Sequence, residues 1–538
     1  MKYCVIPEPY RFEIKSSDIV FDIFDETAFE AEPSAEKSFN SLISFLEEFF
    51  TVYPSGLAKG KIRLEISGKG ESEGYSLKVE RGRVLLSGND EKGLFYAVQT
   101  LKQLLFCGDG KLTEIEIEDK PRFRVRGFML DCARHFFSVE AVKQFIDMMA
   151  FHKLNEFHWH LSDDQGFRCQ LEGKLLLTEI GSYRSNTNFN NEPHEGYYTK
   201  ADIKEIVDYA HNRYIKVIPE IDSPGHVMAM LAAYPELACF LQDYSVSTFW
   251  GIKHDVLCVG KESTFEFMQE LFDELTDIFT DGVIHLGGDE VPTVRWESCP
   301  HCQKRMKDEG LTSEEELHTY YLDRMATYLR NKGTDVRMWN DRVKEKMVDK
   351  SVTWQLWNGE MNEQDVVKEL NDGRKFVISC GDYYYLSFPY ALTSLEKCYN
   401  FEPVFDGLTE EGEKNILGTE ACLWTEFVPD MITADKMTYP RIAAICESAW
   451  SMKDKKNFDL FKEKLGSYYG ILGETGINAA PLKKTSPEGI KKLAGKIYWK
   501  RRSLYWGAHH NIMSDIRVKR ILNETKKENE NNESYTDA

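Results

Sequence analysis

At residues 283–291 the sequence reads Val-Ile-His-Leu-Gly-Gly-Asp-Glu-Val, a hydrophobic run that ends in two glycines and two adjacent acids. Because successive side chains of a strand point to opposite faces, Asp289 and Glu290 can share a pocket only where the strand has ended and the chain turns. The glycine pair permits such a turn. Two carboxyl groups held close together in a desolvated pocket do not both ionise freely, and the protonated one can serve as an acid catalyst. Most Asp-Glu pairs simply lie in solvated loops, so the surrounding sequence has to decide between these interpretations.

This stretch is the fourth of eight strand-like segments in the central part of the chain. They cover residues 126–131, 155–163, 215–222, 283–290, 335–341, 351–357, 375–380 and 415–424. Segments with helical spacing lie between them, at residues 139–152, 200–213, 263–279, 313–332 and 363–371. Eight strands that alternate with helices over about 300 residues are typical of an α/β protein with a closed (β/α)8 TIM barrel. An open doubly wound sheet is the alternative, but no GxGxxG or GxxxxGKS/T motif follows any of these strands.

Each of the eight segments ends in an acid, a base or a large aromatic residue. In chain order these are Asp131 and Arg134, Asp163 and Asp164, Asp222 and His226, Asp289 and Glu290, Trp339 and Asp341, Trp357, Tyr383 to Tyr385, and Trp424 and Glu426. In a barrel these ends meet on one face, where barrel enzymes carry their catalytic groups. Aromatic rings offer flat apolar faces to pyranose rings, and carboxylates and arginine bind hydroxyl groups. The sequence therefore predicts a carbohydrate site.

The rest of the chain divides around this barrel. Residues 1–120 are expected to form a small α/β domain, with strands at 61–66, 75–80 and 83–87 and a helix at 91–106. Pro121 breaks that pattern, and the barrel is assigned to residues 121–470. Residues 471–523 are expected to form a helical extension, with helices at 490–499 and 512–523, and the polar residues 524–538 a disordered tail.

The composition excludes several kinds of partner. With 67 basic and 88 acidic residues the net charge is -21, which argues against nucleic-acid binding and is compatible with neutral sugars. No apolar run approaches the roughly 20 residues of a membrane span, and residues 1–9 do not resemble a signal peptide. We therefore expect a soluble, cytoplasmic protein without a membrane partner. A homodimer through the C-terminal helices stays open.

Neither the cysteines nor the histidines predict a metal site. The 12 cysteines are scattered, often in apolar runs, as buried free thiols are in a reducing compartment. Cys299 and Cys302 have metal-like spacing, but no second CxxC motif or histidine pair follows at zinc-finger distance. His158, His160 and His285 are more typical of hydrogen-bonding residues inside a barrel, because no lysine ends the fourth strand as in metal-dependent amidohydrolases. We expect neither a metal nor a cofactor.

Seven spaced motifs resemble glycoside hydrolase family 20, the exo-acting β-N-acetylhexosaminidases. In order they are Arg126-Gly-Phe-Met-Leu-Asp-Cys-Ala-Arg134, His158-Trp-His-Leu-Ser-Asp-Asp-Gln165, Pro219-Glu-Ile-Asp-Ser-Pro-Gly-His226, His285-Leu-Gly-Gly-Asp-Glu290, Trp339-Asn-Asp341, Trp357, and Gly418-Thr-Glu-Ala-Cys-Leu-Trp-Thr-Glu426. The resemblance covers about residues 60 to 460. It implies an enzyme that removes terminal β-linked N-acetylglucosamine or N-acetylgalactosamine from the non-reducing end of a glycan.

The resemblance also implies a substrate-assisted mechanism, in which the 2-acetamido oxygen of the sugar attacks its own anomeric carbon. Glu290 would then be the general acid and base. Asp289 would orient the acetamide N–H, and Tyr385 would bind the acetamide carbonyl. Asp163 and His226 would form a relay to Glu290.

The remaining residues of the implied site bind the sugar. Three tryptophans, Trp339, Trp357 and Trp424, would form its wall. Arg134 and Glu426 would hold the non-reducing hydroxyl groups. Ser387 stands where the family often has an acid or amide, so the preference between the two N-acetylhexosamines stays open.

Two other functions remain as alternatives. A relative that releases the disaccharide lacto-N-biose needs a roomier pocket around Arg134 and Glu426, and the presence of both residues argues against it. A catalytically silent sugar-binding protein would not need the acid pair together with the aromatic wall.

Overall fold

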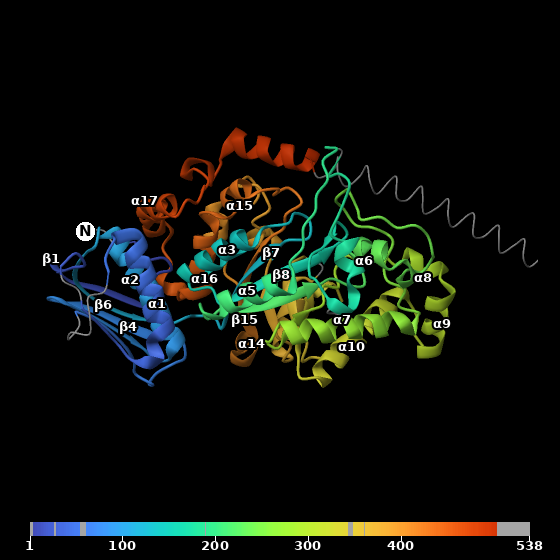
Figure 1. Ribbon diagram of the computed structural model, residues 1–538, viewed down its shortest axis with the longest axis horizontal. Coiled ribbons are helices and arrows are strands. Elements are labelled where there is room, and N and C mark those ends of the chain that lie inside the picture. The colour runs from blue at the N-terminus through green and yellow to red at the C-terminus, as the bar shows by residue number, and fades with distance from the viewer. Residues whose placement is uncertain are drawn as a thin grey trace, which may run out of the picture.

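The computed structural model describes residues 4–25, 28–53, 61–188, 190–342, 348–359 and 361–502. It contains an N-terminal domain, which lies at the blue end of Figure 1, a barrel, and helices that follow the barrel. The predicted helix at 512–523 and the predicted tail at 524–538 lie outside the described residues. No helix in the described ranges is both long and apolar enough to cross a membrane.

The N-terminal domain is a six-stranded sheet covered by helices on one face (Figure 1). Its strands are β1 (Arg11–Asp22), β2 (Phe29–Ala31), β3 (Ile62–Ile66), β4 (Tyr75–Glu80), β5 (Arg83–Gly88) and β6 (Lys111–Asp119), in the order β1-β6-β4-β5-β3-β2. Its helices are α1 (Glu36–Phe50) and α2 (Glu91–Cys107). Strands β3 to β5 and helix α2 match the expected segments closely. Strand β1 was not expected because only one of its side chains is fully buried and its sequence lacks regular alternation.

The eight expected barrel strands are all present and form a closed parallel barrel. They are β7 (Val125–Asp131), β8 (Glu156–Asp163), β10 (Lys216–Ile221), β11 (Val283–His285), β12 (Asp335–Trp339), β13 (Thr353–Leu356), β14 (Phe376–Ile378) and β15 (Ile416–Leu423). Strand β15 pairs with β7 and closes the ring, and β8 pairs directly with β10. A short strand, β9 (Gly166–Phe167), folds back on β8. The prediction of a (β/α)8 barrel is confirmed.

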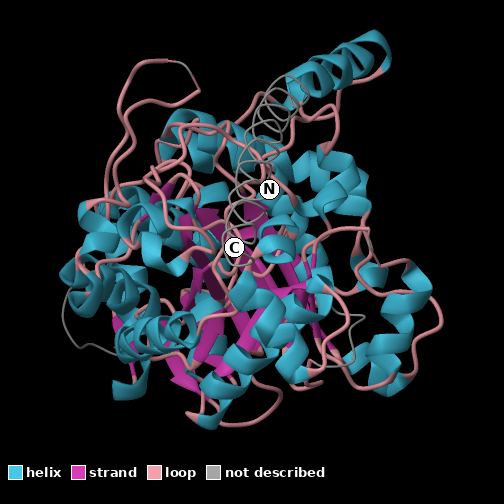
Figure 2. Ribbon diagram, turned by 90° about the vertical axis from the view of Figure 1, so that its right-hand side faces the viewer, coloured by secondary structure: helices cyan, strands magenta, loops and turns pink. Residues whose placement is uncertain are grey.

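Helices surround the barrel strands on the outside (Figure 2). Six of them are α3 (Val139–Phe151), α5 (Lys200–His211), α7 (Glu262–Ile278), α10 (Glu314–Asn331), α11 (Glu363–Asn371) and α16 (Arg441–Trp450). The first five match the predicted helices to within two residues at each end. Side-chain caps explain this agreement for four of the five, because Ser138, Thr199, Ser313 and Asn362 each accept a backbone N–H at the start of a helix.

Further helices occupy the loops and the C-terminal part of the chain. Those in the loops are α4 (Leu176–Glu179), α6 (Met228–Ala233), α8 (Val294–Ser298), α9 (Pro300–Glu309), α12 (Gly381–Tyr384), α13 (Leu395–Asn400), α14 (Glu410–Lys414) and α15 (Met431–Thr438). The barrel is followed by α17 (Phe458–Glu474) and by a helix at residues 489–502, where a helix at 490–499 was expected.

The N-terminal domain and the barrel meet through buried ionic contacts. Lys153 Nζ lies 2.9 Å from Asp119 Oδ2, and both side chains are fully buried. Trp450 Nε1 donates to the same carboxylate at 2.9 Å. Arg126 Nη1 lies 2.8 Å from Glu73 Oε2. These pairs hold the end of the sheet at which β4 begins and β6 ends against the N-terminal end of the barrel. The carboxyl ends of the barrel strands, on the opposite side, therefore stay free for the site.

Candidate active site

The acid pair lies in a tight turn after β11. The strand was expected to run to residue 290 but ends at His285, because Gly287 and Gly288 take positive φ values of 70° and 90°. A Cβ atom at Gly287 would lie 1.8 Å from Asp222 Oδ1, so only glycine fits. The same Asp222 oxygen accepts the Gly288 N–H at 3.0 Å. The turn brings both acids to the carboxyl end of the barrel.

Both carboxylates of the pair face His226. The His226 Nε2 atom lies 3.9 Å from Asp289 Oδ2 and 3.7 Å from Glu290 Oε2. The Asp289 side chain is mostly buried, whereas 37% of the Glu290 side chain is exposed. Burial raises the pKa of Asp289 well above its usual value, and the charge of Asp222 adds to the increase. Asp289 Oδ1 is buried and has no hydrogen-bond partner among the described residues.

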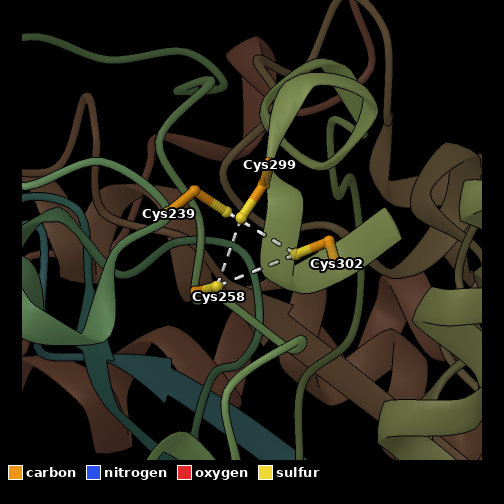
Figure 3. A group of neighbouring side chains, drawn as sticks. All are labelled: Cys239, Cys258, Cys299 and Cys302. Carbon is orange, nitrogen blue, oxygen red and sulfur yellow. Dashed lines mark hydrogen bonds between the residues drawn. The ribbon is translucent and has the colours of Figure 1, made fainter. Parts of the chain in front are cut away.

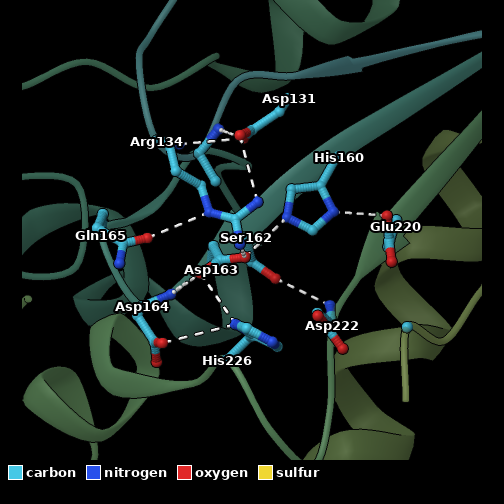
Figure 4. Close-up of polar contacts among 12 residues, drawn as sticks. Asp131, Arg134, His160, Ser162, Asp163, Asp164, Gln165, Glu220, Asp222 and His226 are labelled. Carbon is cyan, nitrogen blue, oxygen red and sulfur yellow. Dashed lines mark hydrogen bonds and ion pairs between the residues drawn. The ribbon is translucent and has the colours of Figure 1, made fainter. Parts of the chain in front are cut away.

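Behind His226 lie two further acids (Figure 4). His226 Nδ1 is 3.3 Å from Asp163 Oδ1 and 3.6 Å from Asp164 Oδ2. Burial lowers the pKa of His226, but the charge of Asp163 outweighs it and raises the pKa well above its usual value. The imidazole is therefore held as a cation between Asp163 and the acid pair, in the order expected of a relay.

Arg134 is anchored among acids in the same cluster (Figure 4). Its Nη2 atom lies 2.6 Å from Asp163 Oδ2 and its Nη1 atom 3.3 Å from Asp131 Oδ2. The guanidinium carbon lies 5.0 Å from the centre of the Trp424 ring. Glu426 lies close enough for Arg134 to act on it: burial raises the pKa of Glu426, and the charge of Arg134 opposes the increase. Arg134 and Glu426 thus share one side of the site.

The aromatic residues form a second wall. The Trp357 and Tyr385 rings are stacked, with centres 6.1 Å apart and an angle of 6° between their planes. The centre of the Trp424 ring system lies 6.1 Å from the centre of the Tyr385 ring and 5.7 Å from the centre of the Trp339 ring system. Of the three consecutive tyrosines, Tyr385 is the one that joins this wall. The structure buries Trp339, Tyr385 and Met129 in one small apolar cluster, separate from the main core.

Two predicted residues take clear positions beside this wall. Ser387 is buried, two residues beyond Tyr385. Asp341, one of the predicted strand-end acids, accepts the Glu290 backbone N–H at 3.1 Å and the Trp357 indole N–H at 2.8 Å. It therefore links the acid turn to the aromatic wall, a role that no sequence motif indicated.

The barrel interior beneath the site holds a buried polar network. Glu220 contacts the nitrogens of all three interior histidines: His160 Nδ1 at 2.5 Å, His158 Nε2 at 3.0 Å and His285 Nδ1 at 3.1 Å. Trp339 Nε1 donates to Glu220 Oε1 at 2.8 Å, the same oxygen that faces His285. These histidines are hydrogen-bonding residues inside the barrel, as the sequence indicated. The central position of Glu220 could not be predicted, because a buried acid within a strand gives no local signal of its partners.

The cysteines differ from the expectation in one place. All 12 are free thiols. Cys299 and Cys302 were discounted as metal ligands because no partner pair follows them in sequence. The structure brings two isolated cysteines, Cys239 and Cys258, to the same point (Figure 3). That reason for excluding a metal therefore does not hold.

A parallel eight-stranded barrel whose strand ends gather paired acids, an arginine and a wall of aromatic rings defines the class of barrel enzymes that act on sugars. Residues 123–453 match the model of the glycosyl hydrolase family 20 catalytic domain, and residues 2–120 match that of glycosyl hydrolase family 20, domain 2. The chain belongs to glycosyl hydrolase family 20.

Several relatives carry related names. The chain is 36% identical to a beta-hexosaminidase of Porphyromonas gingivalis, over 88% of this chain and 64% of that protein. It is 35% identical to a beta-hexosaminidase of Akkermansia muciniphila, over 74% of this chain and 83% of that protein. A solved structure of a family 20 exo beta-N-acetylglucosaminidase from Vibrio harveyi, in complex with N-acetylglucosamine, has a TM-score of 0.82 and 28% identity, covering 89% of this chain and 78% of that one. The chain thus spans just under two thirds of the length of the P. gingivalis relative.

Proposed function

We propose that this protein is an exo-acting β-N-acetylhexosaminidase that uses the acetamido group of its substrate as the nucleophile. The observation that carries the proposal is the acid turn: a buried, unpartnered oxygen on Asp289 lies beside the partly exposed carboxyl of Glu290. A buried acceptor without a donor is costly unless a ligand supplies one. The N–H of a 2-acetamido group is a donor of this kind.

In the first step Glu290 donates a proton to the glycosidic oxygen while the bond from that oxygen to the anomeric carbon breaks. The acetamide carbonyl oxygen attacks the anomeric carbon and forms a cyclic oxazolinium ion. Asp289 accepts the acetamide N–H and offsets the positive charge that develops on the ring.

In the second step water attacks the anomeric carbon and opens the oxazolinium ring. Glu290, now a carboxylate, takes the proton from this water, and the product keeps the β configuration. The exposed part of the Glu290 side chain leaves room for the leaving group and then for water. The cationic His226, 3.7 Å from Glu290, stabilises the carboxylate between the two steps.

The walls of the site support an exo-acting enzyme. The stacked rings of Trp357 and Tyr385, with Trp424 nearby, would hold the acetamide against the anomeric carbon and reduce the freedom that is lost before attack. Arg134 and Glu426 would bind the hydroxyl groups of the terminal sugar. A preference between N-acetylglucosamine and N-acetylgalactosamine would arise in the part of the site next to Ser387.

None of the 12 cysteines, all of which lie in the described ranges, forms a disulfide, and this supports a reducing compartment such as the cytoplasm as the place of this activity. Fractionation of the producing cells, with the full chain followed by antibody, tests this location.

The activity is tested with aryl glycosides that differ at one position. The protein should hydrolyse aryl β-N-acetylglucosaminide or β-N-acetylgalactosaminide but not aryl β-glucoside, which lacks the acetamide. A thiazoline analogue of the oxazolinium ion should inhibit it tightly. Equal hydrolysis of the β-glucoside, or no inhibition by the thiazoline, contradicts a substrate-assisted mechanism.

A further inference from the structure

Four cysteines converge where two loops of the barrel mouth meet (Figure 3). We call them the cysteine cluster: Cys239, Cys258, Cys299 and Cys302. The first two lie in the connection between β10 and α7, which includes α6. The other two lie in the connection between β11 and α10, which includes α8 and α9. Three of the four are fully buried.

The sulfur atoms have the spacing of a tetrahedral metal site. The distance from Cys258 Sγ is 3.6 Å to Cys299 Sγ and 3.7 Å to Cys302 Sγ, and Cys239 Sγ lies 3.8 Å from Cys302 Sγ. All four sulfurs lie within 4.8 Å of one another. Thiolates bound to zinc at about 2.3 Å in tetrahedral geometry are about 3.8 Å apart.

Other states of four cysteines fit this spacing less well. A disulfide requires a sulfur–sulfur distance of about 2.05 Å, far shorter than any of these. An iron–sulfur cluster spreads four thiolates over two or four iron atoms, and thiolates on different irons are further apart than the 4.8 Å that encloses all four sulfurs here. A single tetrahedral ion bound by four thiolates is typical of structural zinc.

The local fold is built for this convergence. Cys299 precedes α9 and Cys302 lies in its first turn, where the positive end of the helix favours thiolates. Gly260 lets the other loop approach, because a Cβ atom there would lie 2.2 Å from the His301 carbonyl carbon and 2.3 Å from the Cys302 nitrogen. The two loops therefore meet backbone to backbone beside the sulfur atoms.

The same two loops carry the proposed catalytic groups. Leu257, next to Cys258, donates its N–H to Pro224 O at 3.0 Å, two residues before His226. Trp296, six residues after Glu290, donates its indole N–H to Leu257 O at 2.9 Å. We propose that the cysteine cluster binds one structural zinc ion that fastens the loop of His226 to the loop of Glu290. Four thiolates leave no open position on zinc, so the ion supports the site without joining the reaction.

The first experiment uses the full-length protein purified without chelators. Elemental analysis should find about one zinc per chain, and X-ray absorption should show about four sulfur ligands near 2.3 Å. Zinc ligated by oxygen or nitrogen, iron in its place, or no metal even after the reduced protein is supplied with zinc would overturn the proposal. Metal content is read without any assay of activity, so this result is independent of the proposed function.

A second experiment assigns the metal to these residues. Replacing Cys302→Ser should remove most of the zinc and lower the melting temperature. The matched control Cys169→Ser changes another fully buried thiol outside the cluster and should leave the zinc content unchanged. Equal zinc in both variants contradicts the assignment, and the absorption spectrum of the wild-type protein decides the question if Cys302→Ser does not fold.

Discussion

Gly287 and Gly282 have the same backbone conformation but different surroundings. Both have a φ of +70°, yet a Cβ atom at Gly287 would lie 1.8 Å from Asp222 Oδ1, whereas a Cβ atom at Gly282 would have no atom of the described residues within 4 Å. We predict that Gly287→Ala displaces Asp222 and the acid turn and lowers kcat/KM at least about 100-fold, as small displacements of catalytic groups do. The measurement is hydrolysis of an aryl β-N-acetylhexosaminide.

Gly282→Ala is the control for this variant. It should cost about 1 to 2 kcal/mol in the free energy of unfolding from the left-handed conformation alone and keep its activity. Equal losses of activity in the two variants would show that backbone strain, rather than the contact with Asp222, is responsible.

Asp222 predicts a pH dependence of stability. Burial raises its pKa to about 7, whereas an unfolded aspartate titrates near 4. The folded state therefore favours the protonated form, and the resulting stability is complete below about pH 4 and is lost as the pH rises through about 7. Asp222→Asn does not titrate, so relative to wild type the variant should gain about 2 to 3 kcal/mol in the free energy of unfolding between pH 5 and pH 8. Urea unfolding at both values measures this, and a difference that does not change with pH would contradict it.

At the scale of elements, Asp341 joins the turn after β11 to the tryptophan that follows β13. It accepts one N–H from Glu290 and one from Trp357. We predict that Asp341→Ala leaves both donors without their acceptor and lowers kcat/KM about 10- to 100-fold, since an unsatisfied donor costs about 1 to 3 kcal/mol. Steady-state kinetics on a folded variant measure this.

Trp357→Phe separates the two contacts of Asp341. It keeps an aromatic ring in the wall and removes only the indole N–H, so its loss of kcat/KM should be smaller than that of Asp341→Ala. Normal kinetics in Asp341→Ala would show that the acid turn holds its conformation without this link.

Element positions could be predicted well where the local sequence carries the signal. Five of the helices around the barrel were predicted to within two residues because hydrophobic spacing is a local feature, as are the side-chain caps that four of them have. Strand β11 was predicted too long because a hydrophobic pattern does not show where glycines take positive φ. Strand β1 was missed because few of its side chains are buried.

At the scale of the whole molecule, a buried ion pair joins the two domains. Asp119 accepts hydrogen bonds from Lys153 and Trp450 of the barrel, and from Tyr75 of its own sheet. We predict that Asp119→Asn lowers the free energy of unfolding by about 3 to 5 kcal/mol, because it leaves the Lys153 charge buried without its counterion. Calorimetry of the full chain measures the effect.

The matched control is Asp208→Asn, which removes an exposed helix pair with Lys204. It should change stability by less than about 0.5 kcal/mol. Similar effects in the two variants would mean that the domain contact adds little to stability.

The fold and most of the site could be predicted from sequence for different reasons. The barrel followed from eight strands and their spacing, and the strand ends identified the residues that meet at its mouth, because parallel barrel topology brings them together. Contacts between distant loops could not be predicted. The contacts of Glu220 with three histidines and a tryptophan leave no pattern in the local sequence. The approach of Cys239 and Cys258 to Cys302 leaves none either.

In the proposed mechanism Glu290 is the proton donor and Asp289 orients the acetamide group of the substrate. The most direct test is the turnover of a β-N-acetylglucosaminide by Glu290→Gln and Asp289→Asn, with Glu297→Gln, an exposed acid on α8, as control. We predict losses of about 10²- to 10⁴-fold in kcat for Glu290→Gln and about 10²- to 10³-fold for Asp289→Asn, with the control unchanged. Near-normal turnover in both acid variants, each correctly folded, would contradict the account.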